Sequence, residues 1–414
     1  MSLSYIFEMS LFRYSFKFLF MSFLMAYLFL NSYDVDAGCV LSLNSDFGNP
    51  SPVYIKNNQF LIPNLTDRVS LRSGEFMVVA CPGSRNHIVL GNETGNGRQF
   101  DVLDAKCVEK TSFLLGGWRG EFRNVTCKTQ PWTTVYDTKK SCHLNSKLYR
   151  IGYEIQKAFY SLYEACFDLS EMKTHYVTHV LTPFTTLQSY RRTQFLDGGV
   201  FDNVPISKLY LKRNQMEIME RILGTNSTEL YNKRQALTRG HLAPRADFPL
   251  RAQMRATFQY INTAPQWRTI NSGDWGALES ALRKKVVQLG HSVTVYTGTH
   301  GVLALPNRDG ALQSIYLHFD ENNNGVVPVP MYFYKVVYDP TARTAVAFVT
   351  INSAFYNKTT TDELQFCSDI CDSNPQYSWL TWRSRDGAHS FCCDYTEFAN
   401  EVKLVKLDVR GRFY

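Results

Sequence analysis

Side chains able to act on a phosphodiester gather in one stretch, residues 238–283. The candidates are polar or basic: Arg239, His241, Asn262, Asn271, Glu279 and Arg283. Hydrolysis of a phosphodiester needs a base for the attacking water, positive charge on the phosphate and a means of neutralising the departing oxygen. The intrinsic pKa of histidine, near 6.5, leaves His241 largely neutral at neutral pH and able to take a proton. Arg239 and Arg283 can each present paired donors to phosphate oxygens.

The same stretch carries the positive charge of the chain. Residues 233–285 contain ten Lys or Arg against three Asp or Glu, whereas the formal net charge of all 414 residues is +7. The rest of the chain is therefore close to neutral. Positive charge focused on a histidine indicates a polyanionic partner. A basic run taken alone is, however, equally typical of a solvated face.

A helix is expected directly after Asn271. Residues 274–290 have apolar side chains at helical spacing and a closing glycine, and they place Glu279 and Arg283 on one face. Two simpler interpretations remain open. Asn271 could be an N-cap residue, and Glu279 with Arg283 could form an ordinary surface ion pair. A lone asparagine is also a weak argument for a metal, because Mg²⁺ usually prefers carboxylates.

Several motifs in this stretch occur at fixed spacings. They are Thr238-Arg239-Gly240-His241, Asn262-x-x-Pro265-Gln266, Asn271-x-Gly273-x-Trp275 and Leu278-Glu279, with Arg283 one turn later. Together they resemble the active-site signature of the DNA/RNA non-specific endonuclease family, the ββα-metal nucleases with an Arg-Gly-His motif. The resemblance covers roughly residues 146–414 and is nearest to the secreted double-strand nucleases of arthropods.

The resemblance implies a metal-dependent mechanism. His241 would be the general base, and Asn271 would be the one direct protein ligand of a water-rich Mg²⁺, for which Mn²⁺ could substitute. Glu279 would position metal-bound water. The remaining matched residues would organise the site or stabilise phosphate charge: Asn262, Arg239 and Arg283.

The implied activity is hydrolysis of nucleic acid by an endonuclease. DNA, expected to be double-stranded, and RNA would be cut to 5′-phosphorylated fragments. Further phosphate contacts are expected from three arginines of the basic stretch: Arg245, Arg255 and Arg268.

Two positions depart from the family pattern. Thr238 stands where many members have Asp before Arg-Gly-His, and this could weaken turnover. Arg245 stands where the arthropod branch often has an acidic residue, and this could strengthen nucleic-acid affinity. The alternative is therefore a secreted nucleic-acid-binding protein of the same fold with little turnover. A polyanion-binding glycoprotein is a third interpretation.

The first 37 residues have the pattern of a secretory signal peptide. Arg13 and Lys17 precede an apolar run, Phe18–Leu30, and small residues at Val35 and Ala37 fit a cleavage site. The run is too short to span a bilayer comfortably, which argues against a membrane anchor. We expect a secreted, extracellular protein without membrane attachment after cleavage.

Cysteines and glycosylation motifs agree with secretion. All ten cysteines follow residue 37, and their even number is typical of disulfides. Cys367, Cys371, Cys392 and Cys393 are spaced poorly for zinc and are expected to form two disulfides. Five N-x-T sequons predict glycosylation in surface loops: Asn64, Asn92, Asn124, Asn226 and Asn357.

The predicted domains are a β-rich, disulfide-containing accessory domain over residues 38–145 and an α+β endonuclease domain over residues 146–414, with a mixed or antiparallel sheet. Strands are expected at 176–181, 293–299, 332–338 and 344–351, and a helix at 207–223. Residues 148–170 fit either type. His175 and His179 are expected to share one strand face, without a third metal ligand nearby.

Overall fold

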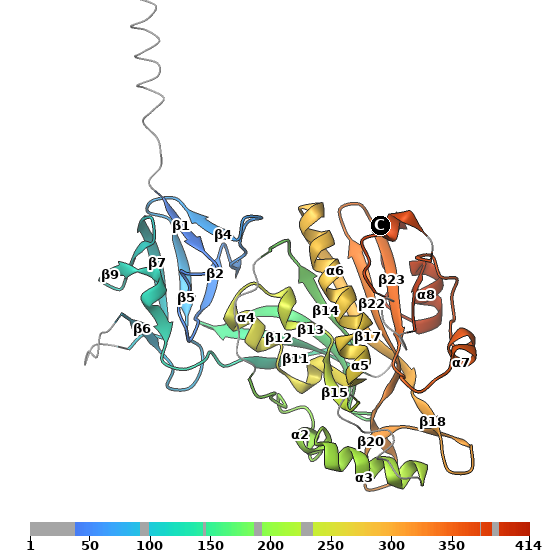
Figure 1. Cartoon of the computed structure of the whole chain (residues 1–414). Coiled ribbons are helices and arrows are strands. Elements are labelled where there is room, and N and C mark those ends of the chain that lie inside the picture. Colours follow the sequence, from blue (N-terminus) through green and yellow to red (C-terminus); the bar gives the residue numbers. More distant parts are fainter. Residues whose placement is uncertain are drawn as a thin grey trace, which may run out of the picture.

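The computed structural model describes residues 38–91, 99–143, 146–185, 193–224, 235–372, 374–382 and 389–414. The expected signal peptide and the sequons at Asn92 and Asn226 lie outside these ranges. Antiparallel strands dominate, and helices occur between them without regular alternation (Figure 1). The fold is α+β, as predicted. Within the described ranges, no helix has the length and apolar character that a membrane crossing requires.

The N-terminal unit, called the accessory domain here, is a six-stranded sheet with two small strand pairs. The sheet order is β3 (Gln59–Phe60), β2 (Val53–Lys56), β5 (Phe76–Ala80), β7 (Val102–Glu109), β8 (Ser112–Leu115) and β9 (Trp118–Glu121). The pairs are β1 (Cys39–Ser42) with β4 (Arg68–Leu71), and β6 (Ile88–Leu90) with β10 (Val125–Cys127), which follows the short helix η1 (Phe122–Asn124). Side chains alternate between core and solvent along β4, as a half-buried strand requires.

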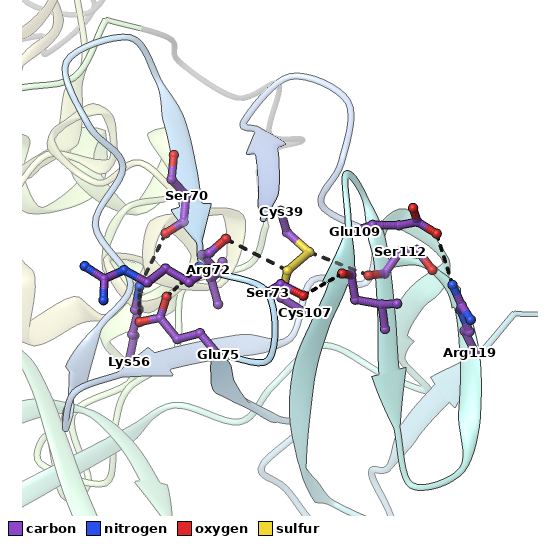
Figure 2. Close-up of a disulfide and its surroundings, with 12 residues drawn as sticks. Cys39, Lys56, Ser70, Arg72, Ser73, Glu75, Cys107, Glu109, Ser112 and Arg119 are labelled. Carbon is purple, nitrogen blue, oxygen red and sulfur yellow. Dashed lines mark hydrogen bonds and ion pairs between the residues drawn. A yellow bond between two sulfur atoms is a disulfide. The ribbon is translucent and has the colours of Figure 1, made fainter. Parts of the chain in front are cut away.

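Two disulfides fasten this unit. Cys39–Cys107 joins the first strand to β7, and Cys81–Cys127 joins the end of β5 to β10. Figure 2 shows the first bridge, with the Lys56–Glu75 ion pair on the neighbouring strands. Covalent ties of this kind compensate for a core that a unit of this size can fill only in part.

The second unit is built on a nine-stranded sheet. Its order is β11 (Thr134–Ser141), β12 (Lys147–Ile155), β13 (Ala158–Asp168), β14 (Lys173–Leu181), β17 (Val293–Val302), β22 (Pro330–Asp339), β23 (Thr344–Ile351) and β24 (Ser390–Cys393), with β25 (Gly411–Arg412) parallel to β23. Residues 148–170, whose type was open, thus form β12 and β13. Strand β11 lies within residues 38–145, the range predicted for the accessory domain, but it pairs with β12 of this larger sheet.

Helices cover both faces of the sheet (Figure 1). Helix α6 (Asp274–Leu289) packs on one face, where Trp275 meets Phe333 edge to face, and helix α8 (Tyr395–Val402) packs on the other, where Phe398 meets Tyr334. Adjacent residues of β22 therefore serve opposite cores, which explains the nearly continuous apolar run of that strand. Gly290 ends α6 in the left-handed conformation, φ 74°.

The remaining elements connect these layers. They are α2 (Ile206–Leu209), α3 (Lys212–Leu223), α4 (Arg251–Ala256), α5 (Arg268–Ser272), α7 (Lys358–Glu363), η3 (Arg245–Asp247), η4 (Tyr260–Asn262), η5 (Pro375–Tyr377), and the strand pairs β15 (Leu237–His241) with β16 (Thr263–Trp267), β18 (Ala304–Pro306) with β19 (Leu312–Ser314), and β20 (Tyr316–Phe319) with β21 (Gly325–Pro328). The helix predicted at 207–223 is present but is divided into α2 and α3.

The expectation that His175 and His179 share a face is wrong. The pairing of β13 with β14 shifts register, so that Cys166 faces Tyr176 while Phe167 faces Thr174, and His175 is the extra residue of a bulge. His175 lines a cavity of about 270 Å³ together with His143 and His300, on the side of α8. His179 is buried on the opposite side, against Phe248.

The C-terminal cysteines pair as predicted. The two disulfides are Cys367–Cys393 and Cys371–Cys392. Asp369 lies near the second bridge, but sulfurs that are bonded to each other offer no thiolates to a metal. A fifth bridge, Cys142–Cys166, ties the end of β11 to β13.

Candidate active site

Most of the candidate residues lie on an antiparallel strand pair and on the two helices that follow it. Strands β15 and β16 pair antiparallel, with His241 opposite Thr263, and helices α5 and α6 follow directly. Gly240 is required here, because a Cβ at this position would lie 2.8 Å from the Cβ of Gln266. Strand β15 carries Arg239 and His241, and the helices carry Asn271, Glu279 and Arg283. This arrangement is a ββα unit.

His241 lies at the end of β15 and packs against two aromatic side chains. The ring centroids of Phe195 and Phe258 each lie 5.2 Å from that of His241, and its side chain is half-buried. The ring centroids of Phe195 and Phe258 are themselves 5.0 Å apart, so the three rings form one cluster that restricts the orientation of the imidazole.

Asn262 holds the loop that follows His241. Its Oδ1 accepts from the backbone nitrogen of Ala243 at 2.8 Å, and its Nδ2 donates to the carbonyl oxygens of Ala243 and Thr257 at 2.9 Å. The side chain is fully buried. Of the roles that the resemblance left open, this geometry favours organisation of the site over contact with phosphate.

Arg239 is held in an aromatic enclosure. Its Cζ lies 4.9 Å from the ring centroid of Tyr210 and 5.4 Å from those of Phe195 and Tyr260. Its Nε donates to the hydroxyl of Tyr260 at 3.1 Å. Cation–π contacts on several sides fix the guanidinium without neutralising it, so its terminal nitrogens remain suited to an anionic ligand.

Thr238 fixes the orientation of Asn271. The Thr238 hydroxyl donates to the carbonyl of Gln266 and accepts from Nδ2 of Asn271, both at 2.9 Å. Since the single hydroxyl proton goes to the carbonyl, the atom of Asn271 facing it must be the nitrogen. The amide oxygen is thereby turned away from Thr238. The N-cap of α6 is Gly273, so the N-cap interpretation of Asn271 is wrong.

This donor set is compatible with a hydrated divalent metal ion. The oriented amide oxygen of Asn271 is a hard ligand of the kind that Mg²⁺ accepts. The side chain of Gln266, which lies opposite Thr238 in the strand pair, is fully buried, and neither of its amide atoms has a hydrogen-bond partner among the described residues. A buried amide without protein partners can form hydrogen bonds with the waters that a bound metal ion retains. Asn271 would hold the ion directly, and Glu279 and Gln266 would hold its waters.

Glu279 is a half-buried carboxyl group on α6. Burial raises its pKa to about 7, against the lowering effect of Lys335. Lys335 itself is fully buried, with Nζ 2.6 Å from the hydroxyl of Thr297 and 5.2 Å from the Trp275 ring centroid. Burial lowers the pKa of Lys335, while Glu279 and Asp247 oppose that shift.

Arg283 pairs with Asp247 and not with Glu279, so the surface ion-pair interpretation is wrong. Its Nη1 donates to Oδ1 of Asp247 at 3.1 Å, and Oδ2 of the same carboxylate lies 2.9 Å from Nε2 of His179. Burial alone would raise the pKa of Asp247, but the hydrogen bond from His179 and the charges of Arg283 and Lys335 bring it below its usual value. The pair fixes Arg283 at the site.

The three arginines expected to contact substrate are placed differently. Arg245 begins η3 and is half-buried, and Arg268 is exposed at the start of α5. Arg255 donates from Nη1 to the hydroxyl of Thr193 at 2.8 Å. That bond ties α4 to the segment that also carries Phe195.

Sequence reasoning missed three residues of this region: Asp247, His179 and Lys335. A lone lysine inside the apolar run of β22 was a visible signal, because a charge in a buried strand needs partners. Asp247 closely follows His241 in the chain. Its pairing with His179 could not be foreseen, because it depends on the bulge at His175.

Fold and site together define a class of enzyme, the ββα-metal nucleases, which hydrolyse phosphodiester bonds. Residues 144–396 match the family described as DNA/RNA non-specific endonuclease, and the chain belongs to that family. Its activity is therefore that of a metal-dependent nuclease acting on nucleic acid.

Individual relatives extend over most of the chain. A salivary endonuclease of Lutzomyia longipalpis is 29% identical over 368 residues, which are 86% of this chain and 80% of the relative. Salivary protein Tsal2A of Glossina morsitans morsitans is 23% identical over 394 residues, 92% and 95% of the two chains. A crystal structure of the EndoG/EndoGI complex matches with 20% identity and a TM-score of 0.33, covering 61% of this chain and 85% of that one.

Proposed function

We propose that this protein is a secreted, Mg²⁺-dependent endonuclease that cuts DNA, with duplex DNA as the main substrate, and also RNA. The observation that carries the proposal is that one five-residue strand contributes to the base, to the phosphate-binding group and to the metal ligand. Strand β15 holds the proposed base His241, places Arg239 in its aromatic enclosure, and orients Asn271 through Thr238.

In the proposed mechanism His241 takes a proton from the attacking water. Attack at phosphorus breaks the bond to the 3′-oxygen, which leaves as an alkoxide and takes up a proton from solvent, and the phosphate stays on the 5′ end. Arg239 holds the phosphate through its terminal nitrogens, and Arg283, fixed by Asp247, adds charge on the side of α6. When bound, Mg²⁺ supplies positive charge to the phosphate and the departing oxygen.

Recognition would rest on phosphates and not on base edges. Arginines dominate the basic surface, with exposed Arg268 and half-buried Arg245 among them. Phosphate contacts make binding largely indifferent to sequence and strongly dependent on salt. Thr238 does not weaken the site under this proposal, because its hydroxyl orients Asn271.

Secretion and glycosylation belong to the same proposal. Five disulfides favour folding in an oxidising compartment. The sequon asparagines Asn64, Asn124 and Asn357 are exposed. We propose residues 1–37 as the signal peptide, followed by the accessory domain and the endonuclease domain.

The test uses the mature chain with supercoiled plasmid and with long double-stranded RNA, in Mg²⁺ or in EDTA, beside a His241→Ala variant. We expect cutting in Mg²⁺ that EDTA and the substitution both abolish, with 5′-phosphate ends that a ligase accepts. Tight binding of plasmid without cutting by the wild type would refute the proposal and favour a binding protein of the same fold.

A further inference from the structure

Helix α4 connects two parts of the candidate site. Through η3 its N-terminal end leads back to Asp247, which holds Arg283. Two residues after its C-terminal end comes Phe258, whose ring centroid lies 5.2 Å from that of His241. A shift of α4 would therefore move supports of both the proposed base and the phosphate-binding arginine.

The helix cannot hold this position by itself. It has only six residues, fewer than an isolated helix needs to be stable in water. On one side the catalytic sheet holds it, because the hydroxyls of Tyr153 and Tyr163 donate to the carbonyls of Ala252 and Ala256 at 2.7 and 2.8 Å.

The accessory domain holds the other side. Leu250, at the N-cap of α4, is 1% exposed and is buried in the hydrophobic core of the accessory domain. Arg251 donates from Nη1 to the carbonyl of Phe47 at 2.9 Å. Ala252 and Ala256 complete a small core with β2 and β5. In Figure 1 the accessory domain lies beside α4.

Further contacts join the two units around this helix. Asp67 accepts hydrogen bonds from the backbone nitrogen and the hydroxyl of Thr185. Phe60 packs edge to face on Tyr153 and Tyr160, with ring centroids 6.4 and 6.1 Å apart. The accessory domain is therefore fixed to the catalytic unit by contacts beyond those of α4.

We propose that the accessory domain is a positioning element of the nuclease site. By holding Leu250 and α4, it keeps Phe258 in place against His241 and keeps Asp247 in place against Arg283. This inference rests on the proposed function for its catalytic readout. It assigns Leu250 a positioning role, because its side chain enters the accessory core and touches no reacting group.

The experiment compares Leu250→Ala with Leu250→Met and Leu115→Ala in the full mature chain. Leu115 is fully buried in the same accessory core, on β8 beside β9, which lies away from α4 in Figure 1. Hydrogen exchange of residues 241–258, melting temperature, kcat and KM for plasmid cleavage in Mg²⁺ are measured below the unfolding transition of every variant.

Both alanine variants should lower the melting temperature. Leu250→Ala alone should speed exchange in residues 241–258 and lower kcat about tenfold or more with little change in KM, because small displacements of catalytic groups cost rate steeply. Leu250→Met should restore both readouts. Equal kcat and equal exchange in Leu250→Ala and Leu115→Ala would overturn the inference. A wild type without nuclease activity would refute the proposed function, whereas exchange would still decide the positioning role.

Discussion

Replacing Thr238 with valine tests how the proposed metal ligand is oriented. Valine has nearly the shape of threonine but lacks the hydroxyl that donates to Gln266 and accepts from Asn271 at 2.9 Å. Without that hydroxyl the described residues offer Nδ2 of Asn271 no other hydrogen bond, so the amide oxygen loses its fixed direction.

The size of the effect follows from one hydrogen bond. Such a bond contributes about 1 kcal/mol net, which corresponds to a factor of about five in an equilibrium constant. We therefore expect the half-saturating Mg²⁺ concentration for cleavage to rise about fivefold in Thr238→Val, with kcat at saturating Mg²⁺ little changed. Thr238→Ser keeps the hydroxyl and should behave as the wild type.

The assay is the initial rate of plasmid nicking across a Mg²⁺ titration at constant ionic strength. Constant ionic strength is needed because phosphate contacts weaken with salt. A valine variant whose half-saturating Mg²⁺ matches that of the wild type and the serine variant would refute the proposed orientation of Asn271.

Two further predictions concern the buried charges. Asp247→Asn removes the negative charge that pairs with Arg283 and acts on Lys335, so urea unfolding should show a loss of about 3 kcal/mol. Asp137→Asn, at an ion pair whose Lys139 is 82% exposed, should lose less than about 1 kcal/mol, and equal losses would contradict the buried network. Burial raises the pKa of Glu279 from 4.5 to about 7, so the folded state binds this proton more tightly than the unfolded state does. In EDTA the free energy of unfolding of the wild type should therefore fall by about 3 kcal/mol as the pH rises from 4.5 through 7. Glu279→Gln should not show this fall. A stability difference between wild type and Glu279→Gln that does not change with pH would contradict a raised pKa of Glu279.

Local patterns predicted the elements that local physics determines. Helix α6 was foreseen because its apolar spacing and the closing Gly290 act within one segment. The run of β22 was foreseen as a strand because branched and aromatic residues alternate between two buried faces. The matched motifs led to the prediction that His241, on β15, and Asn271, on α5, belong to one site.

Partners distant in the sequence could not be predicted. Arg283 and Glu279 have the ideal spacing for an ion pair, yet Arg283 bonds to Asp247, which η3 brings to it. His175 and His179 lie on opposite faces because β14 has one extra residue relative to its partner β13. The sequence of β14 alone does not reveal that extra residue. The insertion of Leu250 into the accessory core is a tertiary contact without a local signal.

The central claim is that His241 removes the proton from the attacking water. Its ring packs against both Phe195 and Phe258, so His241→Ala leaves a space of imidazole size beside these two aromatic side chains. The most direct measurement is plasmid cleavage by His241→Ala in Mg²⁺ as imidazole is added. The account predicts negligible cleavage without imidazole and recovery that follows the concentration of its neutral form. Cleavage by His241→Ala at the wild-type rate, without imidazole, would contradict it.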